Sequence, residues 1–300
     1  MQVPIDKPYT SELLEETIEG LVKVYPFIDL TVIGTSRLGR PLYALTIGHG
    51  GQEILINAAH HANEWITSVI LMRFLEECAE SFVSKAHIWD EISLHCIPMV
   101  NPDGVDLLTG GITPSRIAYK DAAEMSAQCT QPFPDCWKAN ICGVDLNSNY
   151  PAGWDLAKAH KFRRGFTTPG SRDYVGTKPL SEPESCVMAA YTQVNNFALT
   201  LSLHTQGEEI YWRYMDFMPP GAEELARKFS QVSGYLCEDV PSESSHAGYR
   251  DWFIATFNRP GFTIECGMGE NPLPLTQFDD MYKKTSPILR EALAFRVDLS

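Results

Sequence analysis

Hydrophobic and polar positions along the chain follow two periods in turn, and this predicts a sheet covered by helices. Residues 10–24 place apolar side chains three or four positions apart, which is typical of a helix that stops before Pro26. Residues 53–59 (EILINAA) form a nearly continuous apolar run, the pattern of a strand buried on both faces. Because such patterns keep alternating, a largely parallel or mixed sheet is expected.

The other elements follow from the same reasoning. Strands are expected at residues 30–34, 41–48, 92–100, 198–203, 209–214 and 262–266. Helices are expected at residues 65–82, 222–234, 249–257 and 277–295, and residues 181–184 (SEPE) resemble a capping box that opens another helix ending at residue 197. Residues 101–104 (NPDG) indicate a turn. The pattern fades between residues 106 and 181, and loops of that length in a compact domain are usually functional.

These elements predict one α/β domain over residues 1–300. The length is at the upper end of what a single hydrophobic core supports, and no internal repeat or linker interrupts the chain.

Residues 60–65 (HHANEW) carry the strongest local chemical signal, because they directly follow the buried strand at 53–59. In open α/β sheets, ligands bind beyond the carboxyl ends of the strands. A turn entering a helix brings residues i and i+3 to one side, so His61 and Glu64 are candidates to chelate one metal ion. His60 competes as a ligand, but it could equally point into the sheet.

His204 is the candidate third ligand, because it ends the apolar run at residues 199–203. Catalytic zinc usually keeps three protein ligands and one open position. An isolated HxxE pattern is weak and more often marks a histidine that caps a helix. Two histidines that each end a hydrophobic strand favour the metal site.

Glu265 is the candidate catalytic carboxylate, because it lies at the end of the otherwise apolar strand at 262–266. Carboxylates are rarely buried unless they are paired or functional, and a structural salt bridge is the alternative. Burial would raise its pKa towards a value suited to proton transfer.

The net charge of −14 argues against nucleic acid and anionic membranes as partners. No run of 18 apolar residues occurs, so no membrane insertion is expected. The N-terminus lacks a secretory pattern, which favours a cytoplasmic location over a spore or the cell wall. The sequence carries no signal for an oligomeric state.

Eight cysteines occur without a CxxC pair, which argues against a zinc ribbon or a thioredoxin-type motif. Those among apolar residues are expected in the core: Cys78, Cys96, Cys186 and Cys266. Cys129, Cys136 and Cys142 share a polar stretch where a disulfide could form, although free thiols are the favoured expectation.

The motifs together, in their order and spacing, resemble the zinc carboxypeptidases, peptidase family M14, over nearly the whole chain. The matching segments are residues 61–65, 101–104, 143–147 (GVDLN), 172–174 (RDY), 181–184, 202–204 and 262–265. The resemblance implies a mixed, twisted sheet of about eight strands with helices on both faces. It also implies one zinc ion per chain, held by His61, Glu64 and His204, with Glu265 as general base for an activated water.

The chain departs from the digestive members of this family at three positions. Ser148 follows Asn147 where those enzymes have an arginine that binds the substrate's terminal carboxylate, and serine cannot make that charge-assisted contact. Lys138 is the nearest match to their carbonyl-polarising arginine, and lysine can still stabilise an oxyanion as a point charge. Glu243 matches the position of their mobile tyrosine.

These departures resemble the bacterial γ-D-glutamyl-diamino-acid peptidases, which cleave the bond between γ-D-glutamate and meso-diaminopimelate in murein peptides. Arg250 matches the position that sets side-chain specificity in the digestive enzymes, and an arginine there suits an acidic group. A solvated charge on a surface helix is the alternative for Arg250. The alternative functions are a metallocarboxypeptidase acting on ordinary peptides and a non-catalytic module that binds wall peptides.

Overall fold

The computed structural model describes residues 3–82, 84, 86–241 and 245–296. Glu243, the position of the mobile tyrosine in digestive relatives, lies outside these ranges.

One eight-stranded sheet runs through the described chain in the order β1-β2-β4-β3-β5-β8-β6-β7. The strands are β1 (Asp29–Thr35), β2 (Pro41–Ile47), β3 (Gln52–Ala58), β4 (Ile92–Ile97), β5 (Phe197–His204), β6 (Glu209–Tyr211), β7 (Leu236–Cys237) and β8 (Gly261–Glu265). The central strands β4, β3, β5 and β8 are parallel, whereas β2 pairs with β4 and β6 pairs with β8 in antiparallel fashion. This confirms the mixed sheet of about eight strands.

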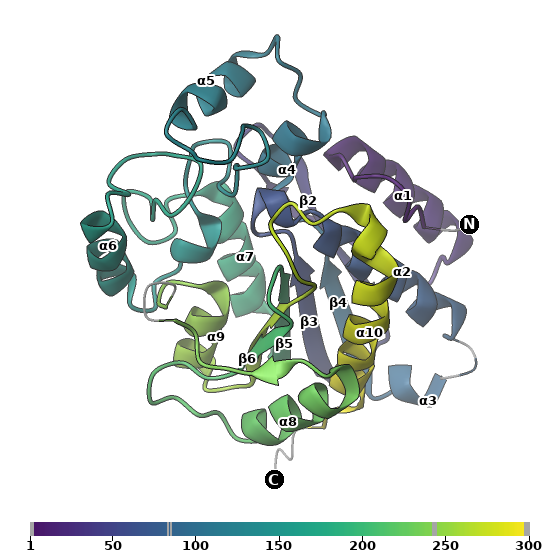
Figure 1. Ribbon diagram of the computed structural model, residues 1–300. Coiled ribbons are helices and arrows are strands. Elements are labelled where there is room, and N and C mark those ends of the chain that lie inside the picture. The colour runs from purple at the N-terminus through teal and green to yellow at the C-terminus, as the bar shows by residue number, and fades with distance from the viewer. Residues whose placement is uncertain (1–2, 83, 85, 242–244, 297–300) are drawn as a thin grey trace.

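Helices cover both faces of the sheet. They are α1 (Ser11–Val24), α2 (Ile66–Glu80), α3 (Ala86–Trp89), α4 (Pro102–Thr109), α5 (Ile117–Met125), α6 (Trp154–Arg163), α7 (Pro183–Val194), α8 (Ala222–Ser233), α9 (Tyr249–Phe257) and α10 (Phe278–Ala294). Figure 1 shows α1, α2 and α10 on one side of the sheet, and α7 and α9 on the other.

The alternation of side chains along β3 explains this two-sided packing. Ile54 and Ile56 belong to the core beneath α1, α2 and α10, whereas Leu55 between them packs with the side chains of α7 and α9. Successive residues of a strand point to opposite faces, so a strand covered on both sides must be apolar throughout. The run EILINAA meets this requirement.

The parallel pairing also fixes where the functional strands end. Ala58 at the end of β3 lies beside Leu203, and His204 at the end of β5 lies beside Glu265 at the end of β8. Three strands from distant parts of the sequence therefore end at one edge of the sheet.

Two predicted local structures are wrong. Residues 101–104 do not form a turn: the Asn101 side chain accepts a hydrogen bond from the Gly104 amide, and Pro102 begins α4. No capping box forms at residues 181–184, because Glu182 is the N-cap residue but makes no side-chain capping bond. The helix that follows ends at Val194, and Phe197 already belongs to β5.

The predicted cysteine environments hold in part. Cys186 is exposed on α7, contrary to its expected place in the core, whereas Cys96 and Cys266 are buried as expected. Cys129, Cys136 and Cys142 are free thiols. Within the described ranges, every helix is too short or too polar to serve as a transmembrane segment.

A buried polar network anchors the loop that carries Lys138 to the start of α7. The amide nitrogen of Asn140 donates to Glu182 Oε2 at 2.9 Å and to Glu184 Oε2 at 3.3 Å. The Arg37 amide donates to Glu184 Oε1 at 3.0 Å. Burial nevertheless raises the pKa of Glu184 to about 7.

This network predicts a pH-dependent stability. Between the ordinary pKa of glutamate and about 7, the unfolded chain ionises at Glu184 while the folded chain holds the proton. The free energy of unfolding should therefore fall with rising pH across this window, by about 1 to 3 kcal/mol from this group. Urea denaturation measures the free energy of unfolding at pH 5 and at pH 8. Between these two pH values, the parent protein should lose about 1 to 3 kcal/mol more than the Glu184→Gln variant. Glu16→Gln, at an exposed position on α1, is the control, and equal shifts in both variants would contradict the prediction.

Candidate metal centre and active-site cleft

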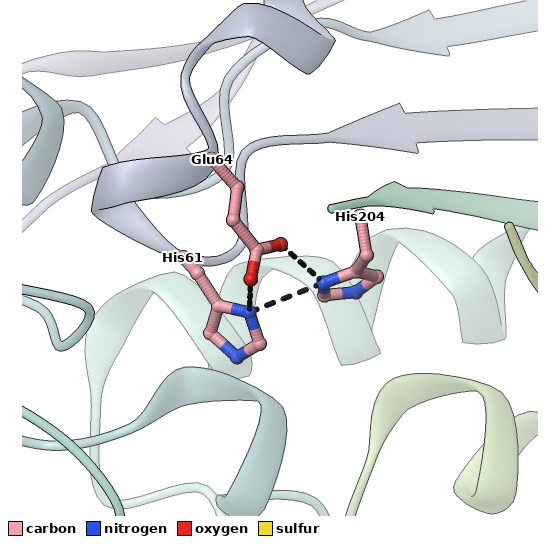
Figure 2. A group of neighbouring side chains, drawn as sticks. All are labelled: His61, Glu64 and His204. Atoms are coloured by element: carbon pink, nitrogen blue, oxygen red, sulfur yellow. Dashed lines mark hydrogen bonds and ion pairs between the residues drawn. The ribbon is translucent and has the colours of Figure 1, made fainter. Parts of the chain in front are cut away.

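Three buried side chains meet at the edge where β3, β5 and β8 end. The Glu64 carboxylate lies between the two imidazoles, with Oε1 at 2.8 Å from Nδ1 of His61 and Oε2 at 2.8 Å from Nδ1 of His204 (Figure 2). The two Nδ1 atoms are 3.1 Å apart. Potential ligand atoms of all three residues lie within 4.8 Å of one another.

Local backbone structure explains how these side chains converge. His61 precedes a short 3₁₀ helix, Ala62–Glu64, so His61 and Glu64 are three positions apart and face the same way. His204 is the last residue of β5, and the amide of Thr205 donates to Glu64 Oε2 at 3.2 Å. The cluster thus joins the end of β5 to the segment after β3.

Asp145 orients the His61 ring. The Nε2–H of His61 donates to Asp145 Oδ1 at 3.2 Å, which leaves Nδ1 as the nitrogen that faces Glu64. A metal-bound histidine commonly uses its second ring nitrogen in this way, because the carboxylate fixes the tautomer and makes the ligand more basic. Asp145 lies in the segment at residues 143–147, but its contact with His61 was not predicted from the sequence.

The donor set fits a zinc ion. Two imidazole nitrogens and one carboxylate are the His₂Glu ligands of an open catalytic zinc site. Burial raises the pKa of Glu64, but the neighbouring His61 and His204 outweigh this and hold it well below its ordinary value. Glu64 is therefore an anion, which is the state that a metal ligand requires.

His60 lies outside this cluster. Its Nε2 is 3.0 Å from the hydroxyl of Tyr150, and its ring stacks behind that of His204 at a centroid distance of 5.8 Å. Burial holds the pKa of His60 well below the ordinary value, so the ring is neutral. Of the two adjacent histidines, His61 is the one that reaches Glu64 and His204.

Glu265 faces the same space from the end of β8. Burial, and then the charge of Glu64, raise the pKa of Glu265 to about 8. Without an ion the carboxyl therefore holds a proton at neutral pH. A divalent cation in the neighbouring cluster would act in the opposite direction and favour the carboxylate.

A cleft of about 390 Å³ opens onto the cluster. The predicted site residues that line it are His61, Glu64, Lys138, Asn147, Ser148, Arg250 and Glu265. The described lining contains five cations, Lys138, Lys161, Arg164, Arg172 and Arg250, and five acids, Glu64, Asp145, Asp173, Asp251 and Glu265. In a chain with a net charge of −14, this cleft is far less negative than the molecule as a whole, and a bound divalent cation would make it positive.

The predicted substrate-binding residues differ in how free they are to act. Burial alone would lower the pKa of Lys138. The charges of Asp145 and the nearby acids together outweigh this effect and raise the pKa above its ordinary value, so the ammonium group stays charged. The Asn147 side chain is already engaged, because Oδ1 accepts the Tyr249 amide at the start of α9.

Arg250 is buried rather than solvated. Its guanidinium group pairs with Asp251 and lies 5.8 Å from the centroid of the Tyr211 ring.

Sequence reasoning missed several lining residues. Lys161, Asp173 and Tyr211 line the cleft, but none of them was assigned a role from the sequence. Arg164 also belongs to the lining, and its side chain is exposed. The segment at residues 172–174 was noted only as a family motif.

The sequence profile of the zinc carboxypeptidase family, peptidase family M14, matches residues 14–288. The chain therefore belongs to this family, and it is a zinc metallopeptidase.

Two relatives and two solved structures illustrate what the chain is similar to. The chain is 41% identical over 293 residues to γ-D-glutamyl-L-diamino acid endopeptidase 1 of Lysinibacillus sphaericus, an alignment that covers 95% of the chain and 72% of that protein. It is 27% identical over 232 residues to carboxypeptidase B of Rattus norvegicus, covering 72% and 51% respectively.

The fold superposes on thrombin-activatable fibrinolysis inhibitor with a TM-score of 0.76 at 19% identity, over 97% of this chain and 74% of that one. It superposes on murein-tripeptide amidase MpaA of Escherichia coli O157 with a TM-score of 0.54 at 20% identity, over 90% and 93%. At these identities the likeness concerns the fold alone.

The contact between His61 and Asp145 predicts a role in metal affinity. Replacing Asp145 with Asn removes the charge that makes His61 a more basic ligand, so zinc affinity should fall about 10-fold. Competition with a chromophoric chelator measures the dissociation constant directly, without any assay of activity. Asp155→Asn, at an exposed position in the first turn of α6, is the matched control. Unchanged affinity in Asp145→Asn would show that the contact does not tune the metal site.

Proposed function

We propose that this protein uses one zinc ion to hydrolyse the bond between γ-D-glutamate and meso-diaminopimelate in murein peptides. The main support is the 41% identity, over 95% of the chain, to an endopeptidase named for the γ-D-glutamyl-diamino acid bond. The complementary physical support is a cleft whose five cations equal its acids in number, within a chain of net charge −14, because such murein peptides carry several carboxylates.

The ligand set assigned to the zinc ion is His61, Glu64 and His204. The ion would act as a Lewis acid on the scissile carbonyl and lower the pKa of water in the site. Glu265 is the proton carrier in this proposal: it accepts a proton from the attacking water and delivers it to the leaving amine. Its position beside His204 in the sheet places it on the same edge as the ligands.

Lys138 is assigned to the carbonyl oxygen, where negative charge develops in the transition state. Its charge is maintained by Asp145, Glu64 and Asp173, and its backbone is fixed by a 2.8 Å hydrogen bond from its amide to the Ser171 carbonyl. A preorganised cation is effective in a buried site because little reorganisation is needed during the reaction.

Recognition of the diamino acid is assigned to Arg250. Its side chain is buried against the cleft and held by Asp251, so its direction is fixed before substrate binds. A fixed guanidinium group is well suited to a carboxylate. Ser148 lies nearby in the lining without the charge that a terminal-carboxylate clamp requires, which suits a substrate that need not end at the cleaved residue.

The proposal predicts which of two peptides is cleaved. With zinc bound, the protein should hydrolyse L-Ala-γ-D-Glu-meso-diaminopimelate at the γ-D-glutamyl bond and leave an ordinary C-terminal dipeptide substrate intact, as followed by mass spectrometry. Glu265→Gln should lower kcat at least 100-fold while still binding zinc, because only the proton carrier is lost. Cleavage of the ordinary peptide alone would make the protein a carboxypeptidase. Zinc and peptide binding without cleavage of either would make it a binding module.

The assignment of Arg250 predicts a loss that depends on the substrate. Arg250→Ala should lower kcat/KM about 10- to 100-fold for the diaminopimelate peptide, but much less for the lysine analogue that lacks the distal carboxylate. The comparison between the two substrates corrects for any loss of folded protein, and Arg227→Ala, at an exposed position on α8, is the control. Equal losses on both peptides would remove Arg250 from substrate recognition.

A further inference from the structure

A second group of charges lines the cleft apart from the metal ligands. Asp173 lies between two cations: Lys161 pairs with its Oδ1, and Nε of Arg172 donates to its Oδ2 at 2.7 Å. All three residues line the cleft, and Lys161 and Arg172 have no part in the steps assigned above. The ordinary explanation would be a structural salt bridge, but that needs only one cation.

The backbone holds this group rigidly. The Ser171 carbonyl accepts the amides of Lys138 at 2.8 Å and Ala139 at 2.9 Å, and the Tyr174 carbonyl accepts the Asp145 amide at 2.8 Å. Residues 171–174 are therefore fixed between the segment of Lys138 and the segment of Asp145. Asp173 itself has φ of 65°, in the left-handed region that aspartate tolerates better than most residues.

The charges do not balance within the group. Burial raises the pKa of Asp173, but Lys138, Lys161 and Arg172 outweigh this and lower it, so one anion neutralises only part of the positive charge. The Lys161 side chain is 7% exposed, and its only described ionic partner is Asp173. A buried ammonium group is costly unless its charge and its donors are used.

Both cations keep hydrogen-bond donors that the described residues leave unused. An ammonium group has three donors and a guanidinium group has five, whereas the contacts described for Lys161 and Arg172 go to Asp173 alone. Asp173 thus aligns two cations on one wall of the cleft. Together they offer the paired donors that a carboxylate accepts.

We propose that Lys161 and Arg172, positioned by Asp173, form a carboxylate-binding subsite of the cleft. This inference rests on the proposed function. Two carboxylates of the substrate flank the cleaved bond: the free α-carboxylate of the γ-linked D-glutamate and the main-chain carboxylate of the diamino acid. The subsite binds one of them, and it is distinct from Arg250, whose partner is Asp251.

The experiment combines two variants with two amidated substrates. Arg172→Gln and Lys161→Met are assayed on L-Ala-γ-D-Glu-meso-diaminopimelate and on the same peptide with either flanking carboxylate converted to the amide. Arg163→Gln is the matched control, because it changes an exposed arginine on α6 that does not line the cleft. Each variant should raise KM about 10-fold on the parent peptide with little change in kcat, because a charge-assisted contact is lost.

The two amidated peptides show which of the two flanking carboxylates the subsite binds. Amidating the recognised group should raise KM about 10-fold for the parent protein and have no further effect on either variant. Amidating the other group should affect all proteins equally. Unchanged KM in both variants, or equal losses on all three peptides, would overturn the subsite. If Lys161→Met fails to fold, the half-exposed Arg172 side chain still gives the result through Arg172→Gln.

Failure of the subsite and failure of the proposed function give different results. In one case the parent protein cleaves the murein peptide, but amidation changes KM equally in the parent and in both variants. This result would contradict the subsite but leave the proposed function intact. If the parent protein cleaves only an ordinary peptide, the proposed function fails. The same variants then test the subsite on that peptide, with its terminal carboxylate free or amidated.

Discussion

The parallel pairing of β3, β5 and β8 is the constraint on which the rest of this site depends. Parallel strands end at the same edge of a sheet, so the strand pairing alone brings residues that are far apart in sequence close together there. His61 and His204 are 143 positions apart, yet their Nδ1 atoms lie at 3.1 Å. Because His204 lies beside Glu265 in the register, a shift of that pairing would separate the metal site from the proposed proton carrier.

Three buried carboxylates near this edge of the sheet are each paired with a group of opposite charge or with an imidazole. Glu64 lies between two imidazoles, Asp145 contacts His61, and Asp173 binds two cations. A single buried charge would be destabilising because it is removed from water. Attraction between neighbouring groups of opposite charge offsets part of this desolvation free energy. The same arrangement keeps Lys138 protonated and Glu64 ionised, which are the states that the proposed mechanism needs.

The sequence revealed those parts of the fold and site that depend on strand patterns. His204 and Glu265 could be found because each ends a buried apolar run. Residues 101–104 were predicted wrongly because asparagine and proline favour a turn and a helix start equally well, and only packing decides between them. Cys186 has apolar neighbours along the chain, but it lies on the outer side of α7, where neighbours in sequence face other directions.

Lys161 and Asp173 show why the remaining site could not be read from sequence. Lys161 lies in the last turn of α6, where a basic residue is favoured by the helix dipole whatever its function. Its burial results from Asp173, twelve positions later, whose left-handed backbone conformation no local pattern indicates. The end of a strand can be predicted from the local hydrophobic pattern. The pairing of Lys161 with Asp173 instead depends on contacts between segments that are not adjacent in sequence. The metal ligands therefore lie at or just after strand ends, and the loops between residues 106 and 181 are where a change of substrate can be accommodated without moving these ligands.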